Sequence, residues 1–201
     1  MKKVKDHYYK LAKEKNYSAR SAFKLEEIDK KYKLIKKKMS VLDLGASPGS
    51  WTEYVLRKTE STASIIAIDL KPLETKLADK VQFFLHDITQ LSEKEIPSDK
   101  KFDIVLSDMA PNTSGNKGLD HQRSLELCYE VVKQTKLHLK TGGSMICKVF
   151  QGEDLQSFVL DEVKPIFKSY KQFKPKSTRS ESVEIFIIGF DYLGEKEGSE
   201  L

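Results

Sequence analysis

Residues 41–51, with the sequence Val-Leu-Asp-Leu-Gly-Ala-Ser-Pro-Gly-Ser-Trp, form an apolar run that enters a glycine-containing turn and then a helical pattern. Open α/β sheets bind ligands where a buried strand ends in such a turn. Gly45 and Gly49 let the backbone approach a ligand closely. Their spacing, G-x-x-x-G, lacks the second glycine of the dinucleotide fingerprint, so a cofactor without a pyrophosphate fits better than a dinucleotide. Read alone, the segment is also compatible with a plain tight turn between a strand and a helix.

Further short apolar or β-branched runs follow this stretch, with helical patterns between several of them. Strands buried on both faces show such unbroken runs, and the order strand, helix, strand produces parallel neighbours. The last two runs are joined by a polar loop, which predicts an antiparallel hairpin. The chain is therefore predicted to be α/β, with a Rossmann-like, mostly parallel doubly wound sheet and a C-terminal antiparallel hairpin. The expected strands are residues 41–44, 65–69, 81–85, 102–107, 145–150 and 183–190, with 170–173 as the hairpin partner, and the expected helices are residues 51–57, 120–139 and 155–167.

Two aspartates stand at the ends of the next two strands. Asp69 is the last residue of its strand, and Asp87 follows the strand after it. A carboxylate at the first position can accept hydrogen bonds from ribose hydroxyls, and one at the second can accept a hydrogen bond from an adenine amino group. Each aspartate alone could equally cap a helix or lie in a solvated loop. Together with the turn at Gly45, they predict a site for an adenosine-bearing cofactor.

Four charged residues stand where the local pattern favours something apolar or inert, and such departures collect at functional sites. Lys148 lies in an otherwise apolar strand, and Asp108 closes the strand before it. Lys24 lies on the expected N-terminal helix, and Glu184 lies in the last strand. The alternative for Lys148 is a structural lysine whose amine reaches solvent at the strand end. For Lys24 and Glu184, the alternative is an ordinary surface charge.

Five segments resemble motifs of the FtsJ (RrmJ/RlmE) ribosomal RNA 2′-O-methyltransferase family, and the resemblance runs from about residue 6 to residue 190. The segments are residues 19–25, 43–51, 107–112, 148–152 and 183–185. This resemblance implies a class I methyltransferase fold and an activity on RNA. It implies a catalytic tetrad of Lys24, Asp108, Lys148 and Glu184. It also implies an S-adenosylmethionine site that is lined by Gly49, Trp51, Asp69, Asp87 and Asp108, beside Gly45 of the same turn.

The residue types of the tetrad suit methyl transfer to a hydroxyl. A ribose 2′-hydroxyl is a weak nucleophile, so it needs a nearby base and in-line placement of oxygen, carbon and sulfur. A lysine can be that base where burial and a neighbouring cation lower its pKa. We hypothesise that Lys148 takes the hydroxyl proton and that Lys24 supplies the neighbouring positive charge. In this hypothesis Asp108 and Glu184 orient the two amines and the ribose.

Positive charge is concentrated at the N-terminus. The net charge is +5, and residues 1–40 hold 14 Lys or Arg against 5 Asp or Glu. The region includes a helix that is expected to start at Ser18 or Ser21 and to end near the lysines at 36–38. A basic arm suits a polyanion such as RNA, although a solvated lysine-rich helix is the alternative. Residues expected to stack on bases are Tyr8, Tyr9 and Tyr17, and residues expected to form a second basic patch are Lys171, Lys174, Lys176 and Arg179.

Length and composition predict one domain over residues 1–201, with a basic N-terminal helical arm at 1–38 and a short acidic tail at 195–201. No apolar run is long enough to span a bilayer, and the N-terminus lacks signal or transit features. We therefore expect a cytoplasmic monomer without a membrane partner. Cys128 and Cys147 are expected to be buried free thiols, and no residues show the spacing of a metal site.

The resemblance defines the reaction more closely than the target, because family members modify ribosomal RNA, transfer RNA or messenger RNA caps. A compact chain is most similar to the bacterial ribosomal form, which implies a uridine of large-subunit (23S-type) ribosomal RNA in the ribosomal subunit. The alternative is the transfer RNA anticodon loop. Two rival functions are a nicotinamide oxidoreductase, which lacks the dinucleotide glycines, and an RNA-binding assembly factor, which would not need all four residues of the tetrad.

Overall fold

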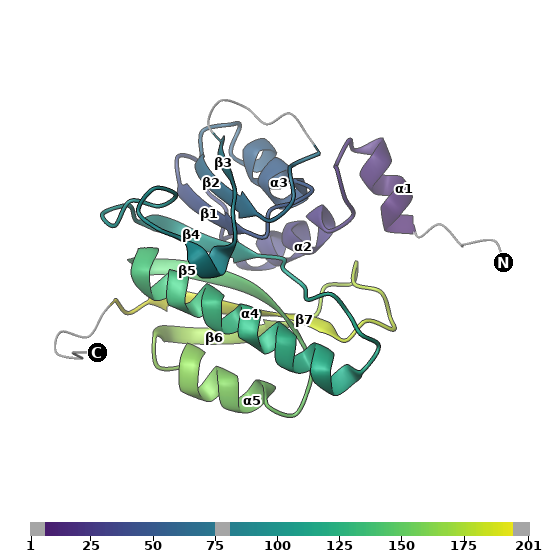
Figure 1. The fold of residues 1–201 in the computed structure, drawn as a ribbon. Helices are drawn as coiled ribbons and strands as arrows, with labels where there is room; N and C mark the ends of the chain where they lie inside the picture. The colour runs from purple at the N-terminus through teal and green to yellow at the C-terminus, as the bar shows by residue number, and fades with distance from the viewer. Residues whose placement is uncertain (1–6, 75–80, 195–201) are drawn as a thin grey trace.

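The computed structural model of the chain describes residues 7–74 and 81–194. Within these residues, seven strands form one sheet in the order β3-β2-β1-β4-β5-β7-β6 (Figure 1). Strands β1 to β5 pair in parallel, whereas β7 is antiparallel to both β5 and β6. The predicted parallel sheet with a C-terminal antiparallel hairpin is confirmed. The strands are β1 (Ser40–Leu44), β2 (Ser64–Asp69), β3 (Val81–Leu85), β4 (Phe102–Ser107), β5 (Leu139–Phe150), β6 (Phe167–Phe173) and β7 (Glu184–Tyr192).

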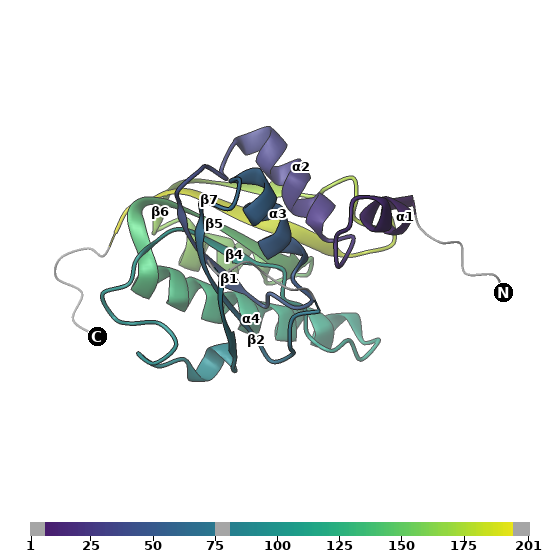
Figure 2. The ribbon, with the colours of Figure 1, turned by 90° about the horizontal axis from the view of Figure 1, so that it is seen from above.

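Helices cover both faces of the sheet. Figure 2 shows α2 and α3 on one face and α4 on the opposite face, with α1 beside the end of α2. This arrangement follows from the chain order, because each crossover between parallel strands must pass over one face of the sheet. The helices are α1 (His7–Glu14), α2 (Ala22–Tyr32), α3 (Ser50–Lys58), α4 (Lys117–His138) and α5 (Leu155–Phe158), with a 3₁₀ turn η1 (Ile88–Gln90) and a π-helical turn η2 (Val159–Val163).

The sheet buries apolar side chains on both faces. Val41 and Ile104 pack in the layer under α2 and α3. Leu42 and Val105 pack in the layer under α4 and α5. Successive residues of a strand point to opposite faces, so a strand covered on both sides is apolar throughout. This burial explains the unbroken apolar runs of the sequence.

The two cysteines lie together in the second of these layers. Cys128 of α4 and Cys147 of β5 are buried free thiols, as expected, and their Sγ atoms are 3.5 Å apart. The Cys128 Sγ also donates to the backbone oxygen of Lys148 at 3.3 Å. The thiols therefore help to pack α4 against the strand that carries Lys148.

The helix predicted at residues 155–167 is too long. Helical structure ends at Val163, and Phe167 begins β6 instead. The Phe167 ring lies 5.7 Å from the Tyr192 ring and fills the space above Gly189, where an added Cβ would lie 2.6 Å from it. Pairing with β7 thus outweighs the helical pattern of the segment, because tertiary packing overrides local propensity.

Helix α2 also ends earlier than expected, at Tyr32. Lys33 adopts a left-handed backbone (φ 57°) and donates its N–H to the Asp29 oxygen, which closes the helix before the lysine run. At the other end, Ser21 occupies the N-cap position without a side-chain capping bond. Its hydroxyl instead lies 2.6 Å from the Ser50 hydroxyl and so links α2 to the start of α3. The predicted acidic tail, residues 195–201, and the first six residues of the basic arm lie outside the described residues.

Candidate active site

The carboxyl ends of β1, β2, β4 and β5 meet at one edge of the sheet. Since β2 and β4 lie on opposite sides of β1, the strand order reverses beside β1. Ligands of open α/β sheets bind at such a switch point. The antiparallel strand β7 starts at the same edge, because Glu184 pairs with Phe150 at the end of β5. The topology therefore brings together side chains from five separate parts of the sequence.

The turn after β1 needs glycine at Gly45. This residue has φ 77°, and a Cβ added to it would lie 2.1 Å from Met109 Cγ in the segment after β4. The Gly45 N–H donates to the Ile68 oxygen of β2 at 2.8 Å. Gly49, with φ 117°, precedes the first residue of α3. Both predicted glycines thus shape a close-packed turn at the switch point.

The predicted strand-end aspartates lie beside this turn. Asp69 accepts one backbone hydrogen bond on each carboxylate oxygen, from Ser47 and from Lys71, both at 2.8 Å. Asp87 caps η1 through its Oδ1, which accepts from the Thr89 N–H and hydroxyl at 2.9 Å. A carboxylate oxygen has two lone pairs, so Asp69 can accept further bonds, and Oδ2 of Asp87 has no hydrogen bond among the described residues. Both carboxylates can therefore still accept hydrogen bonds from a ligand.

The four residues of the predicted tetrad converge at the same edge. Lys148 Nζ of β5 lies 3.0 Å from Asp108 Oδ1. Lys24 Nζ of α2 lies 3.9 Å from the same oxygen and 2.5 Å from Glu184 Oε1 of β7. The Lys148 amine also donates to the backbone oxygen of Asp108. One carboxylate oxygen thus connects two lysines that are 124 positions apart in the sequence.

This cluster is largely withdrawn from water. The exposed fraction of the side chain is 7% for Lys148, 9% for Lys24, 13% for Glu184 and 16% for Asp108. Buried charges are costly unless they are paired, and here two amines face two carboxylates.

A family model described as FtsJ-like methyltransferase matches residues 17–192 of the chain. The chain belongs to the FtsJ-like methyltransferase family. The match includes the turn after β1 and all four residues of the tetrad. The protein is therefore a methyltransferase, and the fold and family inferred from the sequence are confirmed.

Relatives of this FtsJ-like methyltransferase are similar over nearly their whole length. A protein of Oleidesulfovibrio alaskensis named ribosomal RNA large subunit methyltransferase E is 43% identical, with 100% of this chain and 98% of the relative covered. A protein of the same name from Bdellovibrio bacteriovorus is 42% identical, with 92% and 95% covered. The crystal structure of a ribosomal RNA methyltransferase from Plasmodium falciparum superposes with a TM-score of 0.78 at 33% identity, covering 89% of this chain and 100% of that one.

Trp51 has a different position from the one expected for a cofactor-lining ring. Its side chain is buried, packs 5.7 Å from the Phe186 ring and donates its Nε1–H to the Ser21 oxygen at 2.9 Å. The indole therefore joins α3 to α2 and β7, the elements that carry Lys24 and Glu184. A role for Trp51 in cofactor binding stays a prediction.

Asp43 is a site residue that the sequence analysis missed. It is buried in β1, where it accepts a hydrogen bond from the Thr52 hydroxyl at 2.6 Å. Burial raises the pKa of its carboxyl to about 7; the Thr52 bonds oppose this rise, and the nearby charges of Asp108 and Asp69 add to it. The available signal was a carboxylate inside an otherwise apolar strand. Three carboxylates therefore meet at the switch point of this methyltransferase.

The basic and aromatic residues of the predicted arm are divided among several surfaces. Tyr8 and Tyr17 pack against Phe23, with ring centroids 5.6 and 5.8 Å apart, and Arg57 lies over the Tyr17 ring. Tyr8 and Tyr17 therefore have part of their ring surface covered by other side chains, whereas Tyr9 is 42% exposed and has the Lys13 amine 5.2 Å from its ring centroid. Stacking of these tyrosines on bases stays a prediction.

The second predicted basic patch lies beside the tetrad. Lys174, Lys176 and Arg179 are exposed in the loop that leads from β6 to Glu184. Glu27 of α2 holds this loop by accepting the backbone N–H groups of Lys176 and Ser177 at 2.6 and 2.8 Å. The loop thus presents positive charge next to the catalytic edge.

In the part of the chain that the structure describes, no helix has the length and apolarity needed to cross a bilayer. Across residues 7–74 and 81–194, no group of three or more His, Cys, Asp or Glu side chains is placed to hold a metal ion.

Proposed function

We propose that this FtsJ-like methyltransferase transfers the methyl group of S-adenosylmethionine to the 2′-hydroxyl of a ribose in large-subunit ribosomal RNA, at a uridine of 23S-type RNA. The observation that carries the proposal is the pair of buried lysines that share Asp108 Oδ1 beside the turn after β1. A base that is buried next to a second cation, at the ligand-binding edge of the sheet, suits deprotonation of a weakly acidic hydroxyl.

The residues at the switch point fit S-adenosylmethionine. This cofactor carries a positive sulfonium and a positive ammonium group and no phosphate. Asp69 lies against the turn after β1, where it accepts the Ser47 N–H, and Asp87 follows β3, so two carboxylates flank the place where a cationic ligand would bind. Asp69 and Asp87 retain acceptor capacity for the ribose hydroxyls and the adenine amino group. When bound, the cofactor supplies an electrophilic methyl group attached to sulfur.

The chain's own residues provide the proton transfer and the placement. In the proposed step the Lys148 amine, after its own proton has left, accepts the proton of the 2′-hydroxyl as the hydroxyl oxygen bonds to the methyl carbon. A bound cofactor would supply that carbon, and its sulfur would keep the electron pair of the broken carbon–sulfur bond. Asp108 holds the Lys148 amine in place, and Glu184 holds Lys24 so that its positive charge lies near the developing oxyanion. The proton then leaves Lys148 for solvent.

The choice of RNA rests on relatives and on charge. Curated relatives at 40–43% identity carry the name ribosomal RNA large subunit methyltransferase E, which favours ribosomal over transfer RNA as the substrate of this chain. The exposed basic loop at residues 174–183 lies next to Glu184 and can position RNA phosphates without reading sequence. A ribosomal substrate implies action in the cytoplasm, where bacterial large subunits are assembled.

Product mapping tests this proposal. The protein would be incubated with methyl-labelled S-adenosylmethionine and, separately, with large ribosomal subunits, free large-subunit RNA and transfer RNA that lack the modification. We expect label in large-subunit RNA, in a linkage that resists alkali because the 2′-oxygen is methylated. Label on a base, or label in transfer RNA with none in large-subunit RNA, would contradict the proposal.

A further inference from the structure

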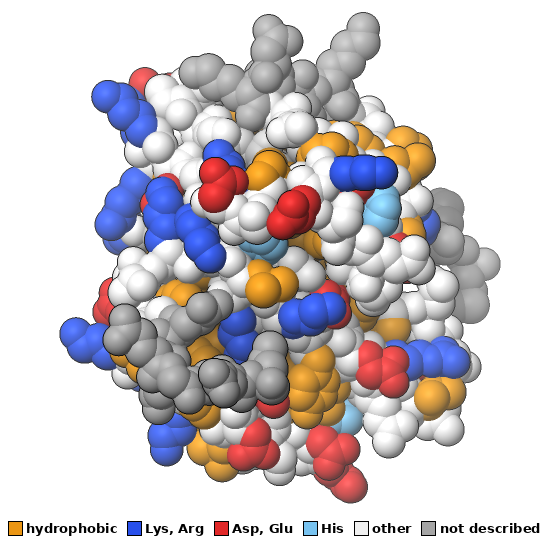
Figure 3. Space-filling model, turned by 60° about the vertical axis from the view of Figure 1, so that its left-hand side comes forward, with side chains coloured by type: hydrophobic (Ala, Val, Ile, Leu, Met, Phe, Trp, Pro, Cys, Tyr) orange, Lys and Arg blue, Asp and Glu red, His pale blue; other side chains and the backbone are white. Residues whose placement is uncertain are grey.

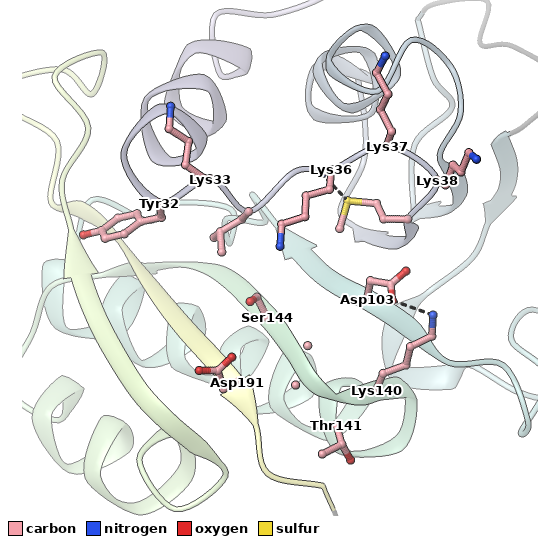
Figure 4. Close-up of a pocket in the computed structure, with 14 residues that line it drawn as sticks. Tyr32, Lys33, Lys36, Lys37, Lys38, Asp103, Lys140, Thr141, Ser144 and Asp191 are labelled. Carbon is pink, nitrogen blue, oxygen red and sulfur yellow. Dashed lines mark hydrogen bonds and ion pairs between the residues drawn. The ribbon is translucent and has the colours of Figure 1, made fainter.

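A pocket of about 520 Å³ lies at the end of the sheet where the parallel strands β4 and β5 begin, opposite to the end that carries the tetrad (Figure 4). It is formed by the segment after α2, the start of β5 and the end of β7. We call it the lysine pocket, because its lining includes Lys33, Lys36, Lys37, Lys38 and Lys140. Figure 4 shows the Lys36 amine pointing into the space between the segment and β5, while Lys33, Lys37 and Lys38 extend outward from the rim.

Positive charge dominates the lysine pocket. Its lining has five lysines and two aspartates, Asp103 and Asp191. Lys140 is paired with Asp103 at 2.7 Å, and Lys37 is paired with Glu60 at 2.6 Å. Among the described residues, Lys33, Lys36 and Lys38 have no carboxylate within ion-pair distance. Figure 3, which turns the left side of Figure 1 forward, shows several Lys or Arg side chains gathered on the left of this face.

The segment that carries these lysines is held in place by the fold. Ile35 and Met39 are buried, and the Ile35 N–H donates to Asp29 Oδ1 at 2.8 Å. The Lys38 N–H donates to the Thr62 hydroxyl at 3.0 Å. The backbone that carries the lysines is thus fixed by these contacts. Lys140 of β5 adds a fifth lysine to the lining. Like charges that are held together in this way favour binding of a polyanion.

The chemistry of the lining indicates phosphate rather than base. Lysine amines bind phosphates as point charges. The only aromatic residue of the lining is Tyr32, and its ring already packs against Phe173 and Phe190, at 5.9 and 5.3 Å between centroids. A base therefore finds no free ring on which to stack. Such a site grips the backbone of a nucleic acid without reading its sequence.

The position of the pocket relative to the tetrad defines which part of an RNA it can hold. Leu139 and Cys147 of β5 pair with Phe102 and Ser107 of β4, which are five residues apart, so at about 3.3 Å per residue the start of β5 and the Lys148 end are about 17 Å apart. Helix α2 connects the two sites, since Lys24 lies in its first turn and Lys33 follows its last residue. Lys30 and Lys31 are exposed on the same helix between them.

We propose that the lysine pocket binds the phosphate backbone of the substrate RNA at a segment remote from the methylated ribose. This inference rests on the proposed RNA substrate and extends it. An RNA whose target ribose lies at the tetrad follows α2 and reaches the pocket only when it is large or folded. The pocket thus favours an extended ribosomal RNA over a short fragment that carries the same target.

The test compares two variants of equal charge. K33Q/K36Q/K38Q removes three lysines of the pocket, and K94Q/K133Q/K164Q removes three exposed lysines outside it. Each is assayed with full-length large-subunit RNA and with a fragment of about six nucleotides, which at about 3.4 Å per nucleotide extends about 10 Å on either side of the target. Filter binding of both RNAs at several salt concentrations is measured in parallel.

We expect K33Q/K36Q/K38Q to raise KM and Kd for the long RNA about tenfold and to leave kcat and the short fragment unchanged. The slope of log Kd against log salt should fall by about 2, since each phosphate contact contributes roughly 0.7 to 0.9. Equal losses in the control variant, equal effects on both RNAs, or unchanged affinity for the long RNA would each overturn the inference. If the lysine pocket instead binds an acidic protein, the affinity for the long RNA would be unchanged.

Failure of the proposed function gives a different result. If the wild-type protein transfers no methyl group to either RNA, the proposed reaction is wrong. Filter binding of the long RNA by the two variants then still decides whether the lysine pocket binds phosphate. Circular dichroism of both variants excludes misfolding as the cause of a loss.

Discussion

At the scale of single residues, Asp108 is the centre of the site. Its Oδ1 lies 3.0 Å from the Lys148 amine and 3.9 Å from the Lys24 amine. The ion pair with Lys148 is the shorter of the two, while Lys24 lies closer to Glu184, at 2.5 Å. Removal of either lysine leaves a partly buried carboxylate with less positive charge nearby to balance its negative charge. The two lysines are therefore expected to differ in role although they share a partner.

Lys148→Ala is expected to lower kcat at saturating cofactor by at least about 100-fold, because loss of a general base typically costs 10²–10⁴ in rate. Cofactor affinity should change little, and Lys148→Arg should not restore activity, since arginine stays protonated. Single-turnover methylation measures the rate, and calorimetry measures the cofactor affinity. Lys168→Ala, which removes an exposed lysine on β6, is the matched control. Near-normal turnover of Lys148→Ala would show that Lys148 is not the general base.

Asp43 gives a prediction on stability. Its pKa of about 7 in the folded protein exceeds the ordinary value of 3.8, so the folded state binds more protons than the unfolded state between these pH values. The contribution of Asp43 to the free energy of unfolding therefore falls as pH rises from about 4 to about 7. This fall is on the order of 2–4 kcal/mol.

Asp43→Asn removes this contribution, because asparagine does not ionise and its side-chain oxygen can still accept the Thr52 bond. We expect the variant to be more stable than the wild type at pH 8, with a much smaller difference at pH 4. Urea unfolding without cofactor at several pH values measures the effect. Parallel pH profiles of the two proteins would contradict the prediction, because they would show that the Asp43 carboxyl has the same pKa in the folded and unfolded states.

At the scale of elements, α2 links catalysis to the rest of the fold. It carries Lys24, and the backbone oxygen of Ser21 at its start accepts from both the Trp51 indole and the Lys24 N–H. Glu27 on the same helix holds the loop before β7. The first turn of α2 is therefore positioned by α3 and by the loop from β6, rather than by the sheet alone.

Trp51→Phe tests this positioning. Phenylalanine keeps the contact with Phe186 but loses the bond to Ser21, which we expect to cost about 1 kcal/mol in stability. Because the lost bond lies next to Lys24, kcat should fall while cofactor affinity stays close to that of the wild type. Tyr54→Phe is the control, since it removes a bond from α3 to Asp29 near the other end of α2. A loss of cofactor affinity in Trp51→Phe, with kcat unchanged, would instead support a cofactor-lining role.

At the scale of the whole molecule, the proposed catalytic site and the proposed RNA-binding pocket lie at opposite ends of the parallel strands. The carboxyl edge collects the three aspartates and the tetrad, and the opposite edge carries the lysine pocket. A ligand that binds the carboxyl edge connects the ends of β1, β2 and β4, which separate when the chain unfolds. Binding must therefore stabilise the fold as a whole.

S-adenosylhomocysteine, the demethylated cofactor, should raise Tm. At 100 times its Kd the stabilisation is about 2.7 kcal/mol, which for a chain of this size corresponds to roughly 5–10 °C. NAD at the same concentration should produce no shift, because the turn after β1 lacks the dinucleotide glycines. Differential scanning calorimetry measures the shift in Tm with each ligand, for the wild type and for Asp69→Asn. A shift with NAD and none with S-adenosylhomocysteine would contradict the cofactor assignment.

The sequence alone was sufficient for the α/β fold, the turn at Gly45 and the family, because each depends on local pattern or on a recognisable motif. It also singled out the four tetrad residues that the structure brings together, and their catalytic roles stay a prediction. Apolar runs report burial on both faces, and polar residues at strand ends stand out against them. The strand β6 was predicted too short and the helix before it too long, because pairing with β7 decided the conformation of Phe167.

Only the tertiary structure decided how residues far apart in the chain share one environment. It turned Trp51 inward against Phe186, raised the pKa of Asp43 through burial and neighbouring charge, and divided the basic N-terminal region between the tetrad and the opposite edge of the sheet. Distances, burial and electrostatic coupling arise between segments that chain order separates. The local sequence pattern therefore cannot report these quantities, because they exist only once the sheet has brought the segments together.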